Sequence, residues 1–227
     1  MTFKKIKLFL IAGLIITSAS AADTPKNFSI SYKYKNPDGS VFRIIKYYMS
    51  EGLKFRSEYF IMNQYQIDAE VKAEKSDKTD ANVKAEMKKE NLTDTEAQII
   101  EILRKDKELV WSLEPSLKLY REVPLKQDGW EHAFSQIFIY DSIKINKTGE
   151  IKVLGYPCEV YEYTQNFSED KWTNIFYVAK DMEVILKSEM LKNGKLVQLQ
   201  EATEFSIDKP ADNVFEVPDG FNKAVDN

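Results

Sequence analysis

The sequence has little of the chemistry on which enzymes and metalloproteins usually depend. Its 227 residues include a single cysteine, Cys158, and a single histidine, His132. A lone cysteine excludes an intrachain disulfide, and no Cys or His cluster with ligand spacing is present. Nucleotide-binding and hydrolase motifs such as G-x-G-x-x-G, the P-loop and G-x-S-x-G are also missing. We therefore expect a protein that is not an enzyme and that uses no metal or cofactor.

The few groups that could carry chemistry are isolated from one another. A dyad of Cys158 and His132 would need the fold to bring them together, with a third group to orient the histidine. Since Cys158 lies in an apolar strand pattern, we favour buried packing. Strand alternation places Glu159 with Tyr161, and Glu162 on the opposite face with Cys158. We single out Glu162 as the candidate inward carboxylate with a raised pKa.

Long apolar runs are also scarce. One occupies residues 8–16, behind three lysines and ahead of the small residues Ala19-Ser20-Ala21. This is the pattern of a secretory signal peptide, and the run is too short to cross a bilayer as a stable helix. We predict a signal peptide over 1–21, cleavage near Ala21, and a soluble protein of the periplasm. No cysteine lies in or just after the cleavage region, so the lipid anchor of a bacterial lipoprotein would have no thiol to attach to.

Basic residues are not in excess. The chain carries 32 Lys+Arg against 36 Asp+Glu, and removal of the three leader lysines leaves 29 against 36, a formal charge of −7. This balance argues against a nucleic acid as partner. There is no basic amphipathic segment that would hold the protein on an anionic membrane. We expect only transient membrane contact.

Strand patterns dominate what is present. In residues 53–61 apolar side chains alternate with charged ones, as in a strand with one buried face. Turn sequences such as Asn36-Pro37-Asp38-Gly39 and Lys192-Asn193-Gly194 separate this run from similar ones. The short spacing between runs indicates antiparallel hairpins. We predict a mainly β (α+β) fold built on a long antiparallel meander.

One stretch that breaks this pattern is a charged insertion at about residues 70–90. It is rich in Lys, Glu, Asp and Ala and has few large apolar side chains, so it cannot bury much surface. Oppositely charged pairs at i,i+4 spacing leave two alternatives, a solvated single helix or a mobile insertion between strands. Directly after it, residues 93–96 have capping-box spacing, but we favour a strand over residues 99–103.

The other stretch is residues 128–140. Trp130, Phe134, Ile137 and Phe138 recur at helical spacing and would form one apolar stripe. We predict a helix that covers the open side of a curved sheet. The helix would either complete a dry core or act as a movable lid whose aromatic face a ligand can replace, and we favour the dry core.

Short motifs in the second half resemble one group of exported bacterial proteins. They are Val110-Trp111-Ser112-Leu113-Glu114-Pro115, Lys147-Thr148-Gly149, Gly155-Tyr156-Pro157-Cys158 and Phe215-Glu216-Val217-Pro218-Asp219-Gly220-Phe221. In this order, after a signal peptide and a meander, they resemble the periplasmic lipoprotein-carrier superfamily (LolA-like fold). They are most similar to a secreted bacterial family of unknown function within that superfamily. The motifs are turn and packing positions, so no functional residue is transferred from the family.

The resemblance implies a single domain over 22–227, with a strongly curved antiparallel sheet that forms a half-closed barrel and a helical plug or lid on the concave face. It implies a soluble periplasmic carrier for a hydrophobic ligand: an acyl chain, a lipid or a lipoprotein. The alternative is a closed, dry barrel in a non-catalytic sensor or assembly component that binds another envelope protein. The candidate cavity and lid residues are Leu53, Phe55, Tyr59, Ile61, Trp111, Trp130, Phe134, Phe138 and Phe176.

Overall fold

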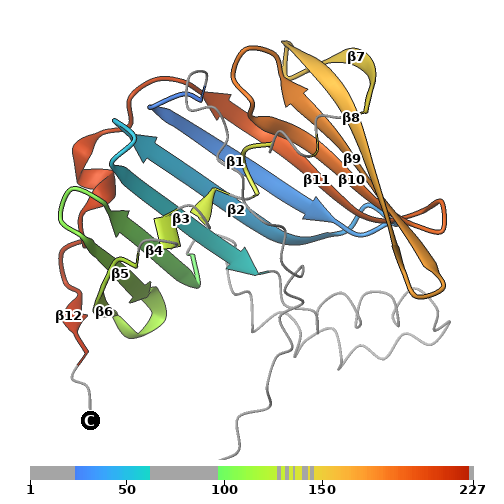
Figure 1. Ribbon diagram of the computed structural model, residues 1–227. Helices are drawn as coiled ribbons and strands as arrows, with labels where there is room; N and C mark the ends of the chain where they lie inside the picture. The colour runs from blue at the N-terminus through green and yellow to red at the C-terminus, as the bar shows by residue number, and fades with distance from the viewer. Residues whose placement is uncertain are drawn as a thin grey trace, which may run out of the picture.

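A single antiparallel sheet makes up most of the described chain (Figure 1). The structure, a computed structural model, describes residues 24–61, 97–126, 129–130, 133–134, 136–139, 143 and 146–224. Its strands are β1 (Phe28–Lys35), β2 (Val41–Ser50), β3 (Lys54–Ile61), β4 (Ile99–Arg104), β5 (Leu109–Glu114), β6 (Leu119–Pro124), β7 (Lys147–Val153), β8 (Tyr156–Phe167), β9 (Asp170–Ala179), β10 (Ile185–Lys192), β11 (Lys195–Ser206) and β12 (Asn222–Lys223). Two short 3₁₀ helices are η1 (Pro115–Leu117) and η2 (Asp212–Phe215). The predicted signal peptide and the charged insertion lie outside the described residues.

The strand order joins two meanders at the middle of the sheet. It runs β12-β6-β5-β4-β3-β2-β1-β11-β10-β9-β8-β7. The chain moves outward from β1 to β6 and then returns from β7 to β11, which pairs with β1. Neighbouring strands are antiparallel except for the short parallel pair of β12 with β6. The predicted meander is confirmed, and β4 confirms the strand favoured over residues 99–103.

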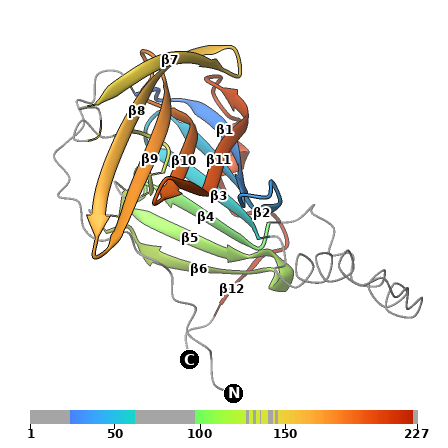
Figure 2. The ribbon, with the colours of Figure 1, turned by 90° about the vertical axis from the view of Figure 1, so that its right-hand side faces the viewer.

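The sheet bends without closing. Figure 2 shows β4–β6 and β7–β9 facing each other across the inner side of the sheet. Within the described residues the end strands β7 and β12 pair only with β8 and β6, so the sheet stays open. The mainly β class is thus confirmed, but the strongly curved half-closed barrel is not.

The inner face is lined by alternate residues of the central strands. On β1, Phe28, Ile30, Tyr32 and Tyr34 are each no more than 2% exposed. Because successive strand side chains point to opposite faces, the even-numbered residues of β1 form one continuous apolar row. The central strand is thereby fixed in register, since a slip by one residue would expose this whole row to water.

The helix predicted over residues 128–140 is wrong for residues 136–139. Of the residues described there, only Gly129, Trp130 and Ala133 are helical. Phe138 instead forms an antiparallel bridge with Val184. The Ile139 N–H donates to the Glu183 carbonyl (3.1 Å), and the Ile185 N–H donates to the Ile137 carbonyl (2.7 Å). Backbone groups that a helix would pair internally are therefore paired with the β9–β10 connection.

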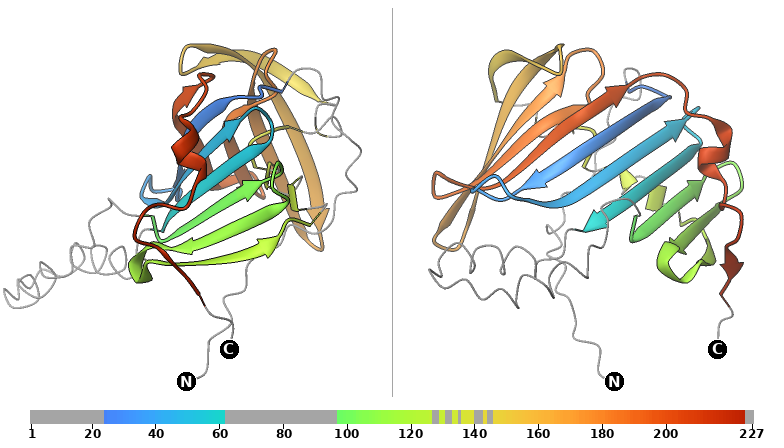
Figure 3. Two further views of the ribbon diagram at one scale, coloured as in Figure 1. Left: turned by 90° about the vertical axis from the view of Figure 1, so that its left-hand side faces the viewer. Right: turned by 180° about the vertical axis from the view of Figure 1, so that it is seen from behind.

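The outer face of β3–β5 is covered by the segment that follows β11. In Figure 3 this segment carries η2 past the ends of β3 and β4 and reaches β12 beside β6. Phe215 is fully buried there, in a cluster with Ile102, Trp111 and Leu113. No helix among the residues described here has the length and apolar character needed to span a membrane.

Two arginines fasten this segment to the sheet. Arg104, whose side chain is 5% exposed, donates to the Phe215 carbonyl (3.1 Å) and pairs with Asp106 (2.7 Å) and Glu216. Arg56 donates to the Val214 carbonyl at 2.9 Å. Each guanidinium thus satisfies a backbone carbonyl that the 3₁₀ turn leaves without a strand partner.

We expect Arg104→Ala to lower the free energy of unfolding by about 2 kcal/mol, because it removes charge-assisted hydrogen bonds from a buried site. Urea unfolding of the two proteins measures the difference. Arg121→Ala, at an exposed position of β6, is the matched control and should leave stability unchanged. Equal stability of the Arg104 variant and the wild type would contradict the fastening role of Arg104.

Candidate functional site

An aromatic cluster on the inner face is the candidate site. The Tyr47 and Phe55 rings stack with centroids 5.7 Å apart, and Tyr32 contacts Tyr47 edge to face at 6.0 Å. Side chains of β1, β2 and β3 thus form one floor across three strands. We call this floor, made of Phe28, Tyr32, Tyr34, Tyr47 and Phe55, the aromatic floor.

The predicted lid residues lie on this floor. Phe134 meets Phe55 edge to face at 4.9 Å and Trp130 at 5.1 Å. Phe138 contacts Phe134 at 6.0 Å and Phe28 at 5.7 Å. We call the described residues of 129–139 the cover. Its aromatic stripe faces the sheet as the sequence predicts, although the backbone is only partly helical.

A polar strip crosses the aromatic floor under the cover. The hydroxyls of Tyr34 and Tyr47 both donate to Gln136 Oε1 of the cover, at 3.1 and 3.3 Å. Gln200 Nε2 donates to the Gln136 carbonyl at 3.3 Å. Burial raises the pKa of Tyr34 to about 12 and that of Tyr47 well above its usual range. Both hydroxyls therefore stay protonated and act as hydrogen-bond donors at neutral pH.

The sheet register shows which predicted residues share the inner face. Directly opposed residues of neighbouring strands point to the same side. One such row is Ile61, Arg43, Tyr34, Gln200, Ser188, Phe176 and Tyr161. Ile61 and Phe176 are therefore on the same face as Tyr59, which packs against the central core. Five predicted residues, Phe55, Tyr59, Trp130, Phe134 and Phe138, belong to that core or pack against it.

Two predicted residues lie elsewhere. Trp111 is opposite Ile102, which is opposite Arg56 on the outer face. It packs in the cluster of Phe215 and donates from Nε1 to Glu122 at 2.9 Å. Leu53 lies in the turn before β3 and is 40% exposed. The sequence predicted the strand of Trp111 but not the register that decides its face, and it began the strand of Leu53 one residue too early.

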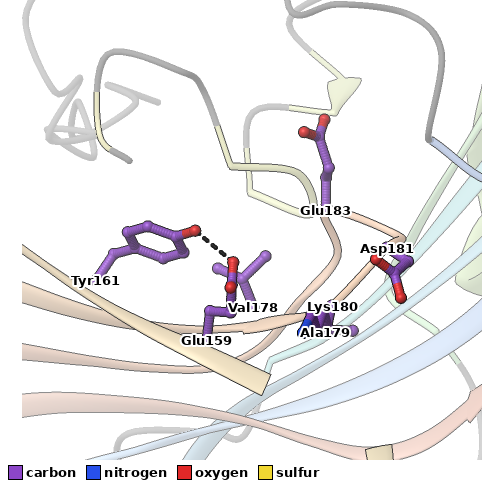
Figure 4. A pocket seen from close by; sticks show the side chains of 7 residues that line it. All are labelled: Glu159, Tyr161, Val178, Ala179, Lys180, Asp181 and Glu183. Carbon is purple, nitrogen blue, oxygen red and sulfur yellow. Dashed lines mark hydrogen bonds between the residues drawn. The ribbon is translucent and has the colours of Figure 1, made fainter. Parts of the chain in front are cut away.

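A hollow of about 200 Å³ lies where β8 begins and β9 ends (Figure 4). The Tyr161 hydroxyl donates to Glu159 at 2.6 Å, and Lys147 Nζ donates to the same carboxylate at 2.6 Å. The hydrogen bond from Lys147 lowers the pKa of Glu159. Since Val178 opposite Glu159 packs with Ile139 of the cover, Glu159 is on the inner face. Glu162 shares its side of β8 with Cys158, which packs in the central core, so the inward orientation of Glu162 stays a prediction.

The cysteine is buried, as predicted. Cys158 is 2% exposed within the central core, and burial raises the pKa of its thiol. A raised thiol pKa lowers the thiolate fraction at neutral pH and hence the reactivity. His132 lies outside the described residues.

Glu101 is a functional candidate that the sequence reasoning missed. It lies opposite Ser57, which lies opposite Tyr47, so its half-buried side chain is on the inner face. Burial raises the pKa of Glu101 above its usual range, and no ion pair joins it to the residues described. The only available signal was its even spacing from Leu103 in a strand pattern, which does not distinguish it from solvated charges.

Three comparisons place the chain among known proteins. A sequence model described as a domain of unknown function (DUF4412) matches residues 62–221. No curated protein matches the sequence. An uncharacterized conserved protein from Thermus thermophilus is 10% identical, with a TM-score of 0.50 over 89% of this chain and 91% of that chain. This likeness shows a shared fold.

Two further solved structures are similar at lower scores. The MucA/MucB complex of Pseudomonas aeruginosa contains a chain that is 13% identical, with a TM-score of 0.46 over 86% of this chain and 56% of that chain. A LolA superfamily protein from Nitrosomonas europaea is 8% identical, with a TM-score of 0.29 over 85% and 90% of the two chains.

We expect Glu101→Gln to raise the melting temperature at about pH 7 and to change it little at about pH 4. Because its pKa is raised in the folded protein, this carboxyl opposes folding increasingly as the pH rises through that pKa. Differential scanning calorimetry at both pH values measures the effect. Glu114→Gln, at an exposed position of β5, is the control. A pH-independent change at Glu101 would contradict this account.

Proposed function

The chain belongs to the family described as a domain of unknown function (DUF4412), and from its inner face we propose that the protein is a periplasmic carrier that holds an acyl chain of a lipid or lipoprotein. Family membership confirms the resemblance drawn from the sequence to a family of unknown function. The observation that carries the proposal is the aromatic floor, which lies under a cover held to it mainly by side-chain contacts.

The cover is fastened unevenly. At one end, residues 137–139 are hydrogen-bonded to the β9–β10 connection. At the other end, Phe134 touches the sheet through its ring contact with Phe55, and Trp130 contacts Phe134 and the Lys105 ammonium. The Gly129 N–H donates to the nearby Lys126 carbonyl (3.0 Å). The Trp130 end is thus the part that an apolar ligand can replace. The ligand would lie along Phe55 and Tyr59, with Phe176 and Ile61 toward the ends of the inner face.

Magnitudes favour replacement by an acyl chain. Displacing Phe134 gives up its three ring contacts, with Phe55, Trp130 and Phe138, worth about 0.5–1.5 kcal/mol each, together with about 3 kcal/mol of burial. Each methylene buried in its place contributes about 0.8 kcal/mol. A chain that buries about six to nine methylenes offsets the loss, and a longer chain binds with a net gain.

The first test is whether the protein carries a lipid. We expect native mass spectrometry of protein purified gently from its own host to show a stoichiometric lipid or acylated peptide. An empty protein that also fails to take up a neutral fluorescent lipid probe would contradict the carrier proposal. Capture of an exported protein by such an empty protein would instead support the alternative, a sensor or assembly component with a closed, dry barrel.

The second test concerns the cover. We expect Phe134→Ala to tighten probe binding about tenfold while lowering the free energy of unfolding, since a ring contact worth about 1.4 kcal/mol no longer opposes displacement. Fluorescence titration and urea unfolding measure the two effects. Phe167→Ala is the matched control, because Phe167 is 52% exposed on β8. A variant that loses stability without any change in probe affinity would point to a dry core.

A further inference from the structure

Arg43 lies at one end of the aromatic floor, without an anionic partner among the described residues. It is opposite Tyr34 of β1 and Ile61 of β3, on the inner face. Its guanidinium carbon lies 4.1 Å from the centroid of the Tyr34 ring. Arg43 Nε is buried and has no hydrogen-bond partner. No ion pair joins Arg43 to any residue described by the structure, in contrast to Arg56 and Arg104.

An unpartnered guanidinium nitrogen in a buried position is uncommon, because burial without a hydrogen bond costs free energy. Stacking on Tyr34 offsets part of that cost and holds the guanidinium plane over the floor. The remaining donors of Arg43 suit a planar carboxylate or a phosphate, which a guanidinium can bind through two parallel hydrogen bonds. The position thus fits an anion that none of the described residues supplies.

Two further donors point to the same place. The hydroxyls of Tyr34 and Tyr47 converge on one acceptor, Gln136 Oε1, which belongs to the cover. When a ligand displaces the cover, these hydroxyls lose that acceptor and need another. Arg43 acts electrostatically on both hydroxyls, opposing the effect of burial on their pKa values. The Gln136 oxygen therefore occupies the place of a ligand oxygen beside a positive charge.

From this geometry we infer that Arg43, Tyr34 and Tyr47 form a head-group subsite, and that the ligand is an amphiphile with an anionic carboxylate or phosphate. This inference rests on the proposed carrier function and specifies its ligand class. The tail would run from Arg43 along β2 to Met49, a path of about 20 Å at the rise of an extended strand. That length accommodates an acyl chain from one leaflet of a bilayer, about 15 Å thick.

The inner face also places a restriction on the head group. Glu101 is on the same face, opposite Ser57, and its carboxylate would repel an anion bound near it. Arg43 and Glu101 lie on either side of Tyr59. Burial raises the pKa of Tyr59, Glu101 raises it further, and Arg43 lowers it. The anionic end of a ligand is therefore directed to the Arg43 side, and the Glu101 side is left to the uncharged part.

The test compares ligands that share a tail and differ in charge. Displacement of the neutral probe N-phenyl-1-naphthylamine is measured with hexadecanoate and with hexadecanol, and in a second arm with phosphatidic acid and with diacylglycerol. We expect the wild type to bind the anionic member of at least one pair about tenfold more tightly. The pair that shows this preference identifies the source of the anion, a free fatty acid or a phospholipid.

Two variants separate recognition of the anionic head group from binding of the apolar tail. Arg43→Met keeps a long unbranched stem and should abolish the preference while leaving hexadecanol affinity unchanged. Lys46→Met removes the same charge from the outer face of the same strand and should keep the preference. Equal affinity of the wild type for both members of each pair, or an equal loss for both in Arg43→Met, would overturn the head-group subsite alone. Failure of the probe and all four ligands to bind would overturn the carrier proposal with it.

Discussion

The pairing of β1 with β11 is the constraint on which the rest of the molecule depends. It joins residues as far apart in sequence as Tyr32 and Ala202 and places the first strand at the centre of the sheet. Without it, the outgoing and returning meanders would be separate sheets, each with an exposed edge and an uncovered apolar face. Loop closure over such a distance is entropically costly, so the buried row from Phe28 to Tyr34 must form together with this pairing.

The same pairing builds an inner face that is aromatic but not wholly apolar. Tyrosine rings fill the floor with large surfaces, and each buried hydroxyl needs an acceptor. Tyr32 donates to the Ile185 carbonyl (2.5 Å), an acceptor within the scaffold. Tyr34 and Tyr47 donate instead to Gln136 of the cover. Phenylalanine at these two positions would be sufficient to pack a dry core. The two hydroxyls instead bind Gln136 when the cover is in place, and a ligand that displaces the cover would have to supply another acceptor.

Much of the fold was predictable because strand periodicity is a local signal. The alternation over residues 53–61 identifies β3 (Lys54–Ile61), and its apolar positions Phe55 and Tyr59 do reach the inner face. The pairing that sets which faces of neighbouring strands lie together is not a local property. Trp111 lies on the outer face because it is opposite Ile102, which is opposite Arg56. The apolar spacing of residues 128–140 was helical, yet tertiary hydrogen bonds turned its second half into a bridge. Arg43 could not be singled out, since its lack of a partner exists only in three dimensions.

Rigidity is distributed unequally between the two faces, and this distribution bears on function. The outer segment with η2 is fastened by Arg56 and Arg104 through charge-assisted hydrogen bonds to backbone carbonyls, which hold β3 and β4 in place. Among its described residues, the cover on the inner face has backbone hydrogen bonds to the β9–β10 connection near residues 137–139, and otherwise relies on ring contacts and on the hydrogen bonds that Gln136 accepts. Ring contacts are exchangeable for other apolar surface at little net cost, whereas a buried guanidinium hydrogen bond is not. A rigid outer side and a replaceable inner side are what a carrier requires, because its binding face must open while its sheet register stays fixed.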